Sequence, residues 1–581
     1  MYEGRQSKAD DLFLCLNEMR KYIAADFACN NWSEVEAYLI ELSKREWSVK
    51  ADFIKWLRDK SELEAVLEEN MAWRYIRMTI DTTDTAKTEA YQFFVTEIQP
   101  NLAPYEDRLN QKMMAASWID ELSQDEAYAI YFRSTRTALD LFREENIPLE
   151  TEINTLSQEY GAISGQQTIE YDGKTLTMPQ AAIFLKNPDE AIRKEVFELI
   201  ANRRQQDREK LDELFTKLVK LRHQTAVNAG CTDYRDFKFK ALGRFDYSIQ
   251  DCLDFHGSIA ELIVPMIRKM QQEQARLLGK DLLKPWDTEV DPTGKAPLKP
   301  FESGKELLAG SIEIFGKLDP YFRDCLTTMD KEGYMDLDSK HGKAPGGYNY
   351  PLYESGIPFI FMNAAGAQRD VVTMVHEGGH AVHSFLSREL ELTGFKSLPS
   401  EVAELASMSM ELITMDHWNH FYSNENDLKR AKKEQLESVL KVLPWIATID
   451  AFQHWIYTHP EHTTAERTAY WLELGKRFGT GMLDYSGYEE VKESSWHRQL
   501  HLFEVPFYYI EYGIAQLGAL GVWKNFKSNP KEALANYKAA LKLGYTKSIP
   551  AIYQTAGLKF DFSKENVKEL TELVDSELKG L

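Results

Sequence analysis

Residues 376–380 read His-Glu-Gly-Gly-His, a pattern that makes strict demands on local geometry. On a helix, His376 and His380 project from one face and lie close enough together to bind one metal ion. Glu377 then points beside that ion, where it can take a proton from a water that the metal activates. The arrangement is typical of zinc peptidases. A buried helix that happens to contain histidines is the alternative, since three fixed residues occur by chance in roughly a few per cent of chains this long.

The residues around this motif predict a strand followed by a helix. Residues 357–363 form a short apolar run, in which Pro358 lacks an N–H and therefore favours an edge position. Asp370 can cap the helix that follows. Gly378 and Gly379 each disfavour a helix by roughly 1 kcal/mol relative to alanine. We therefore expect another element to pack closely against the helix backbone at these glycines.

A third metal ligand is expected from an acidic segment further along the chain. Residues 401–411 predict an apolar helix, on which Glu404 and Glu411 are seven positions apart and so share one face. Acids among alanine, leucine and methionine are rarely buried without a partner, which a metal or a metal-bound histidine would provide. A solvated helix face is the alternative for either acid alone. Catalytic zinc takes three protein ligands, so we predict His376, His380 and Glu404.

Together these features resemble the thimet oligopeptidase and oligoendopeptidase F family of zinc peptidases. The likeness covers most of the chain from about residue 160 and, more weakly, the part before it. The segments in which it is seen are the motif helix extended to His383, the acidic helix at 404–411, a tyrosine-rich segment at 501–513, and the stretches 168–204 and 346–363.

The resemblance implies a role for each site residue and one zinc ion per chain. The implied residues are His376, His380 and Glu404 as zinc ligands, Glu377 as general base, Glu411 as support for a ligand histidine, and His501, Tyr508 and Tyr512 as groups that bind substrate and stabilise the oxyanion. Which of Tyr508, Tyr509 and Tyr512 stabilises the oxyanion stays open. An aromatic helix face packed in the core is the alternative for all three tyrosines.

Other histidines are less suited to a catalytic metal. His417 and His420 are three apart, but no acid follows the first as a base, and His459 and His462 flank a proline in an expected loop. Surface histidines are the preferred interpretation of both pairs. An open tetrahedral site has three protein ligands, and these are already assigned to other residues. We therefore expect a structural or hydrogen-bonding role for His383.

Composition narrows the class of protein. Hydrophobic content of 43% and charged content of 28% are ordinary for a globular chain, and no apolar run reaches the length of a membrane span. The formal charge of −22 disfavours nucleic acid and anionic membranes as partners. Five scattered cysteines indicate neither a disulfide framework nor a thiolate zinc site. Residues 1–20 are polar and lack a signal-peptide pattern, which predicts a cytoplasmic location.

Most of the chain is expected to be helical. Residues 22–160 are a succession of amphipathic segments, and residues 168–177 predict a hairpin with an Asp-Gly turn. Asn187 and Asn529 each precede a proline and an acid, which predicts a helix start at both places. Residues 280–300, rich in proline and charge, predict a loop or linker.

The predicted fold is mostly α, with one small sheet near the zinc helix. Residues 1–165 are expected to form an N-terminal helical region and residues 166–581 the catalytic region. The family that the chain resembles has two helical lobes that flank a deep central channel, which admits short unfolded peptides.

The predicted function is a zinc-dependent oligoendopeptidase that cleaves internal bonds of short, unfolded peptides. One alternative is a zinc exopeptidase of the dipeptidyl carboxypeptidase type. A non-catalytic peptide-binding protein on the same scaffold is a second alternative, and the intact Glu377 argues against it because binding needs no general base. The oligomeric state is left open.

Overall fold

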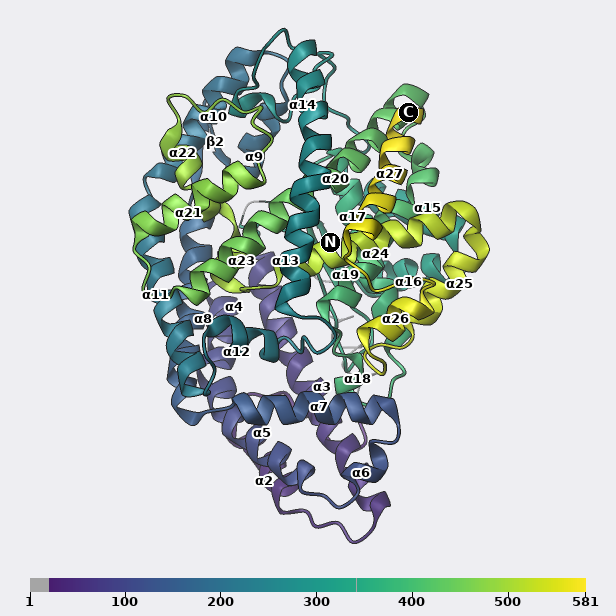
Figure 1. Ribbon diagram of the computed structural model, residues 1–581. Coiled ribbons are helices and arrows are strands. Elements are labelled where there is room, and N and C mark those ends of the chain that lie inside the picture. Colours follow the sequence, from purple (N-terminus) through teal and green to yellow (C-terminus); the bar gives the residue numbers. More distant parts are fainter. Residues whose placement is uncertain (1–19, 341) are drawn as a thin grey trace.

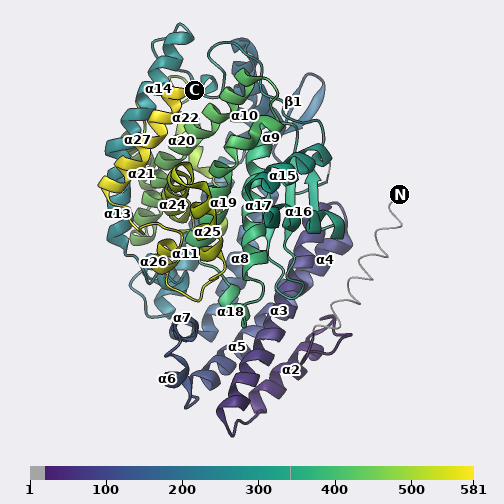
Figure 2. The ribbon, with the colours of Figure 1, turned by 90° about the vertical axis from the view of Figure 1, so that its right-hand side faces the viewer.

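Helices dominate the computed structural model, which describes residues 20–340 and 342–581. Figure 1 and Figure 2 show helices packed around one another, with the sheets confined to short strands. The predicted fold class, mostly α with a small sheet beside the motif helix, is confirmed.

Most of the helices nearest the N-terminus lie at one end of the molecule, the lower end in Figure 1. They are α2 (Trp32–Lys44), α3 (Lys50–Ile80), α4 (Thr85–Phe93), α5 (Gln99–Met114), α6 (Ile119–Leu122), α7 (Glu126–Leu141) and α8 (Ile147–Gly165). Many of their apolar side chains share a hydrophobic core separate from the main one, and Leu392 and Phe395 complete that core. Since Phe395 belongs to the short α18 (Thr393–Lys396), the N-terminal helices hold a segment that lies far away in sequence.

A hairpin and a series of helices follow. They are β1 (Thr168–Tyr171), β2 (Lys174–Thr177), α9 (Met178–Ala182), α10 (Glu190–Gln205), α11 (Arg208–Asn228), α12 (Tyr234–Ala241), α13 (Ile249–Ser258), α14 (Val264–Leu277), α15 (Gly304–Leu318), α16 (Pro320–Glu332) and β3 (Met335–Asp338). The predicted hairpin is confirmed, since Tyr171 pairs with Lys174 across the turn. Asp172 and Gly173 have φ of 51° and 69°, as a tight hairpin turn requires.

One predicted helix start is wrong and the other is confirmed. The helix expected from Asn187 begins at Glu190, and the side chain of Asp189 accepts the N–H of Ala191 as its cap. Asn187 is extended: its side chain accepts the N–H of Asp189, and its carbonyl oxygen accepts a hydrogen bond from the side chain of Arg193 on α10. Asn529 does cap its helix, by accepting the N–H of Glu532.

The remaining elements contain the predicted site. They are β4 (Tyr348–Tyr350), β5 (Phe359–Ala364), α17 (Gln368–Ser387), α18, α19 (Ser400–Ile413), α20 (Glu425–Thr458), α21 (Thr464–Arg477), α22 (Glu489–Glu493), α23 (Leu500–Glu504), α24 (Tyr509–Ser528), α25 (Pro530–Leu541), α26 (Ile549–Thr555) and α27 (Lys564–Gly580). The motif lies on α17 and the acidic segment on α19, which packs against both α17 and α24.

The three-stranded sheet has the order β3-β5-β4, so β5 is its central strand. The edge position expected from Pro358 is therefore wrong. The strand starts at Phe359, after the proline, so the missing N–H costs no hydrogen bond of the sheet. β3 pairs with β5 in parallel and β4 in the antiparallel direction, with Tyr348 opposite Phe361.

Helix α17 begins at Gln368, two residues before Asp370, which was predicted as its cap. Asp370 is the third residue of the helix, and its carboxylate accepts the N–H groups of Ala365 and Ala367 at 2.8 and 2.9 Å. It therefore satisfies backbone donors at the helix start from inside the first turn, as the acid of a capping box does. This anchors the start of the motif helix next to the end of β5.

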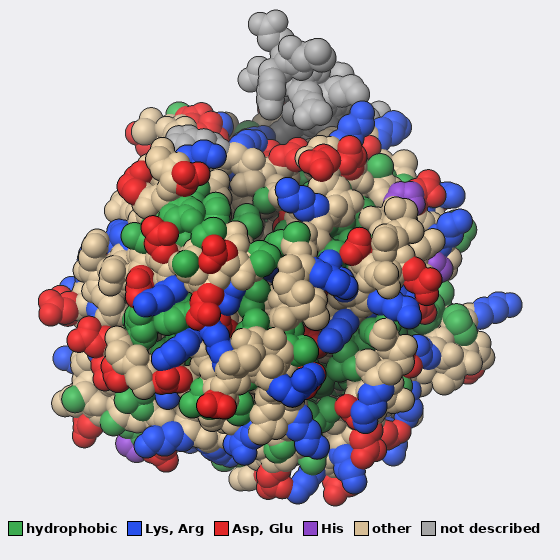
Figure 3. Space-filling model, turned by 90° about the horizontal axis from the view of Figure 1, so that it is seen from above, with side chains coloured by type: hydrophobic (Ala, Val, Ile, Leu, Met, Phe, Trp, Pro, Cys, Tyr) green, Lys and Arg blue, Asp and Glu red, His purple; other side chains and the backbone are tan. Residues whose placement is uncertain are grey.

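Charged side chains of both signs cover the face seen in Figure 3. Lysine and arginine are intermingled there with aspartate and glutamate, and hydrophobic side chains lie between them. In the part of the chain that the structure describes, no helix is both long and apolar enough to cross a membrane.

The two glycines of the motif lie where neighbouring elements touch the α17 backbone. A Cβ atom on Gly378 would lie 2.6 Å from the ring of Phe315. One on Gly379 would lie 2.7 Å from Cα of Ser407 and 2.8 Å from the carbonyl oxygen of Ala406, both on α19. The predicted close packing is confirmed, and at Gly379 the neighbour is backbone that no side-chain rotation can move aside.

We expect Gly379→Ala to lower the free energy of unfolding by about 1–3 kcal/mol, because the added methyl group would force α17 and α19 apart. Thermal and denaturant unfolding measure this loss. Gly165→Ala is the matched control, since no atom lies within 4 Å of the Cβ position at Gly165. That variant should be unchanged or slightly more stable. Equal stability of Gly379→Ala and the parent chain would contradict the close approach of the two helices.

Candidate active site

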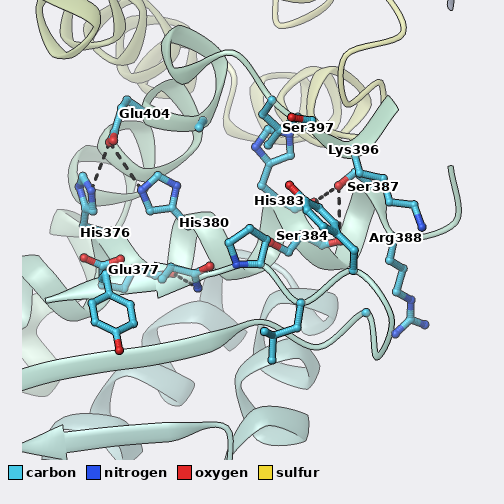
Figure 4. Close-up of a pocket in the computed structure, with 18 of the residues that line it drawn as sticks. His376, Glu377, His380, His383, Ser384, Ser387, Arg388, Lys396, Ser397 and Glu404 are labelled. Atoms are coloured by element: carbon cyan, nitrogen blue, oxygen red, sulfur yellow. Dashed lines mark hydrogen bonds and ion pairs between the residues drawn. The ribbon is translucent and has the colours of Figure 1, made fainter. Parts of the chain in front are cut away.

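Three predicted metal ligands come together between α17 and α19. Nε2 of His376 lies 3.3 Å from Oε2 of Glu404, and Nε2 of His380 lies 3.6 Å from the same oxygen. The three donor atoms lie within 4.8 Å of one another. Figure 4 shows both imidazole rings pointing toward the Glu404 carboxylate. Two imidazole nitrogens and one carboxylate oxygen form a set that suits zinc.

Glu411, one of the acids predicted on α19, holds the ring of His376. Its Oε1 lies 2.7 Å from Nδ1 of His376, and its Oε2 accepts a hydrogen bond of 2.7 Å from Nε2 of Gln435. A proton on Nδ1 leaves the lone pair of His376 Nε2 free to bind a metal. Gln435 lies on α20, and nothing in its sequence setting pointed to this contact.

Two hydroxyl groups orient the carboxylate of Glu404. Ser407 donates to Oε2 at 2.9 Å, and Tyr508 donates to Oε1 at 2.9 Å. Burial alone would raise the pKa of Glu404, but the neighbouring His380 and His376 hold it well below its usual range. The carboxylate is therefore ionised, as a metal ligand must be.

Glu377 lies beside this group and lines the same pocket. Its side chain is buried, and Figure 4 shows it on the opposite side of the two histidine rings from Glu404. Burial raises the pKa of Glu377, while His376 and His380 oppose that rise. A carboxylate that holds a proton more readily than usual suits a group that accepts a proton and then donates it.

The predicted tyrosine segment reaches the pocket from a third direction. His501 lies on α23, Tyr508 just before α24 and Tyr512 on α24. Tyr508 and Tyr512 line the pocket beside the metal ligands. His501 and Tyr509 are not among the lining residues, and their rings pack together with 4.8 Å between the centroids.

The side chain of His501 is held as a neutral hydrogen-bond donor. Nε2 of Gln499 lies 2.7 Å from Nδ1 of His501, which makes Nδ1 the acceptor and places the proton on Nε2. Nε2 lies 3.5 Å from the hydroxyl of Tyr512. Burial lowers the pKa of His501 to about 4, against the opposing effect of Glu404. His501 is therefore uncharged at neutral pH.

A strained backbone turn positions Tyr508. Phe507 is buried and has a φ of 66°, which is unusual for a residue with a side chain. Its N–H donates to Gln453 at 2.6 Å, and its carbonyl oxygen accepts a hydrogen bond from Arg244. Arg244 also forms a buried ion pair of 2.9 Å with Glu511. Sequence reasoning missed this support because its members come from α12–α13, α20 and α24.

The pocket that contains these groups has a volume of about 360 Å³. One wall is the edge of the sheet at Gly347, Tyr348 and Asn349. Arg388 and Lys396 lie at the far end from the metal ligands, as Figure 4 shows. The volume is within the range of sites that enclose small ligands or a few residues of a peptide.

The other histidines considered in the sequence do not join the three-ligand group. His417 and His420 belong to a short 3₁₀ helix, and His459 and His462 lie in the loop between α20 and α21, as expected. All four are at least partly exposed. His383 is buried on α17 and lines the pocket without joining the three-ligand group.

Comparison with known proteins gives two family matches. Residues 183–572 match peptidase family M3, and residues 25–142 match the peptidase M3 N-terminal domain. The oligoendopeptidase F homolog of Borreliella burgdorferi is 24% identical over 390 residues, which are 64% of this chain and 62% of that protein. Oligopeptidase PepF of Bacillus subtilis is 24% identical over 257 residues, 43% of this chain and 37% of that protein. The matched regions span less than two thirds of these curated relatives.

Solved structures are similar over nearly the whole chain. PZ peptidase A, solved with inhibitor 2, is 26% identical with a TM-score of 0.90, and the match covers 97% of this chain and 99% of that one. Oligoendopeptidase-F from Enterococcus faecium shares the fold at 14% identity and a TM-score of 0.64, with 94% and 97% of the two chains covered. The predicted fold is therefore confirmed over nearly the whole chain.

Proposed function

Since this chain belongs to peptidase family M3, we propose that it is a zinc-dependent oligoendopeptidase that cleaves internal bonds of short, unfolded peptides. The observation that most supports this is one pocket lined by a zinc-type ligand set, a buried glutamate and two tyrosines. A pocket of this size between helices also suits an extended chain better than a folded protein.

We propose that His376, His380 and Glu404 bind one zinc ion at this site. The donor set fits, because Glu411 fixes His376 while Ser407 and Tyr508 fix Glu404. Bound zinc supplies a Lewis acid, which polarises the scissile carbonyl and lowers the pKa of the attacking water toward roughly 7.

The remaining steps are assigned to side chains of the chain itself. Glu377 accepts the proton of the attacking water and passes it to the leaving amine. Tyr512 and the Nε2–H of His501 donate to the oxyanion that develops on the carbonyl oxygen. Tyr508 either joins them or keeps Glu404 in place through its hydrogen bond of 2.9 Å.

A zinc exopeptidase that trims dipeptides from the C-terminus is the second candidate. The cationic Arg388 and Lys396 in the pocket favour it, because they could bind a terminal carboxylate. Internally quenched peptides with both ends blocked separate the two activities. An endopeptidase cleaves them with an efficiency similar to that of the free peptides, whereas a carboxypeptidase requires the free C-terminus. A failure to cleave any blocked peptide, with cleavage of the free ones, would overturn the endopeptidase proposal.

We expect His380→Ala to lose one equivalent of bound zinc, because two protein ligands hold zinc far less tightly than three. Elemental analysis of protein purified without added metal measures this loss. His420→Ala is the matched control, since His420 is exposed and is not part of the ligand group. Full zinc content in His380→Ala would contradict the assignment.

The cytoplasmic location and the division of the chain at residue 165 stay predictions.

A further inference from the structure

A second group of metal-binding side chains lies between α13 and α20, outside the pocket. Cys252 and His256 are four residues apart on α13, and Asp450 and His454 are four apart on α20. Each pair therefore points from one face of its helix. The donor atoms of Cys252, Asp450 and His454 lie within 4.8 Å of one another. All four residues are buried, since none is more than 5% exposed.

Hydrogen bonding accounts for little of this group. Nε2 of His256 bonds to Oδ2 of Asp450 at 2.8 Å. Nε2 of His454 lies 3.2 Å from the same oxygen but lacks hydrogen-bond geometry. Among the residues that the structure describes, no partner is found for Asp450 Oδ1, for His256 Nδ1 or for either ring nitrogen of His454. Buried polar atoms without partners are rare and call for an explanation.

The arrangement parallels the proposed catalytic zinc site of the same chain. There, two histidine Nε2 atoms lie 3.3 and 3.6 Å from one oxygen of Glu404. Here, two histidine Nε2 atoms lie 2.8 and 3.2 Å from one oxygen of Asp450. In both places two imidazole nitrogens lie close to one carboxylate oxygen. Here the thiol of Cys252 also lies within 4.8 Å of His454 and Asp450.

The chemistry of the donors suits a structural zinc ion. Thiolate sulfur, imidazole nitrogen and carboxylate oxygen are its protein ligands, and structural sites take four of them with no position open to solvent. A thiolate from Cys252 and the carboxylate of Asp450 would balance the two positive charges of zinc. The ion would also provide a partner for the buried charge of Asp450, which is otherwise costly.

We propose that Cys252, Asp450 and His454 bind a second, structural zinc ion, with His256 as the fourth ligand. The first three already lie within reach of one ion. His256 lies outside that group and bonds to Asp450 Oδ2 at 2.8 Å, so its ring would have to turn from this bond toward the ion to become the fourth ligand. No local pattern predicted this site, because each helix supplies only half of it and the two halves are almost two hundred residues apart.

The proposed ion would lie directly behind the turn that positions Tyr508. The ring of His454 packs edge-on against the ring of Phe507, with 5.4 Å between the centroids. The residue before it, Gln453, accepts the N–H of Phe507. An ion that ties α13 to α20 would therefore stiffen the base of the tyrosine segment without entering the pocket.

Elemental analysis of a chain without the catalytic ligands isolates the second site. In the variant His376→Ala with His380→Ala, expressed with zinc supplied, we expect one equivalent of zinc per chain, against two in the parent chain. This outcome does not depend on the identity of the catalytic metal. A folded double variant that contains no zinc would overturn the proposal.

Cobalt substitution gives a readout that only the second site can produce. Cobalt bound through a thiolate shows a sulfur-to-metal charge-transfer absorption, and the catalytic ligand set contains no sulfur. We expect this absorption in the cobalt-loaded parent chain and in the catalytic double variant. A cobalt-loaded parent chain without the absorption would overturn the assignment of Cys252, whatever happens to the variants.

Single substitutions then test the individual ligands. Cys252→Ala and His454→Gln should each lose one zinc equivalent and the charge-transfer absorption. Cys325→Ala is the matched control, because Cys325 is also a buried free cysteine but lies on α16. That variant should keep both signals. Loss of zinc in Cys325→Ala to the same extent as in Cys252→Ala would show a general effect of misfolding and overturn the ligand assignment.

Discussion

The Glu377→Gln variant should keep its catalytic zinc and lose roughly 10²–10⁴-fold in turnover number, or more if both proton transfers fail together. Glutamine has the same size as glutamate and still forms hydrogen bonds, but it cannot accept a proton from the attacking water. Glu377 is not among the three ligand atoms that lie within 4.8 Å of one another, so the metal site should survive the substitution. Turnover of a quenched peptide and zinc content, measured on the same sample, test both statements.

The environment of Glu377 makes this a sharp test. The side chain is 6% exposed, so a large part of its neighbourhood is protein rather than solvent. Replacement by glutamine removes a buried charge without leaving a cavity, and the fold should be retained. Glu461→Gln is the control for the charge change, since Glu461 is exposed in the loop between α20 and α21. Turnover within tenfold of the parent in Glu377→Gln would place the general base elsewhere.

Local sequence patterns were enough to predict the centre of the site. His376 and His380 follow from the spacing of one helix, and Glu404 and Glu411 from the spacing of another. The Asp-Gly turn at residues 172–173 was predictable for the same reason, because its backbone demands are met by the residues themselves. In these cases the relevant contacts are close in sequence or repeat with the helix period.

The surrounding support could not be predicted in this way. Gln435 reaches Glu411 from α20, and Arg244 reaches the carbonyl oxygen of Phe507 from a segment more than two hundred and fifty residues earlier. Neither residue has a distinctive neighbour in sequence. The central position of β5 was missed for a related reason, since it depends on the parallel pairing with β3, which no local pattern around Pro358 reveals.

The packing at the two glycines of the motif was predictable only in part. Their presence inside a helix predicted a close neighbour, because glycine there is unfavourable without one. The sequence could not say which neighbour it was. At Gly379 it is the α19 backbone beside Ser407, which also holds Glu404, so the same close approach brings the third ligand to the two histidines.

Tyr512→Phe should lower the turnover number by roughly 10²–10³-fold and change the Michaelis constant little. Its hydroxyl lies 3.5 Å from Nε2 of His501 and lines the pocket, where it could donate to an oxyanion. A donor to the oxyanion acts mainly in the transition state, so its loss appears in turnover rather than in substrate binding. Steady-state kinetics, a melting curve and zinc content should be measured together.

Tyr508→Phe is expected to behave differently. Its hydroxyl donates to Glu404 at 2.9 Å, so its loss should first weaken zinc binding, and turnover should recover when zinc is added in excess. Tyr509→Phe provides the control, because Tyr509 lies outside the pocket lining, and we expect turnover close to that of the parent chain. If Tyr508→Phe with full zinc loses turnover while Tyr512→Phe does not, the two tyrosines have exchanged roles. A Tyr512→Phe enzyme that is less stable but fully active would make Tyr512 a core residue, and the oxyanion would then depend on His501 and Tyr508.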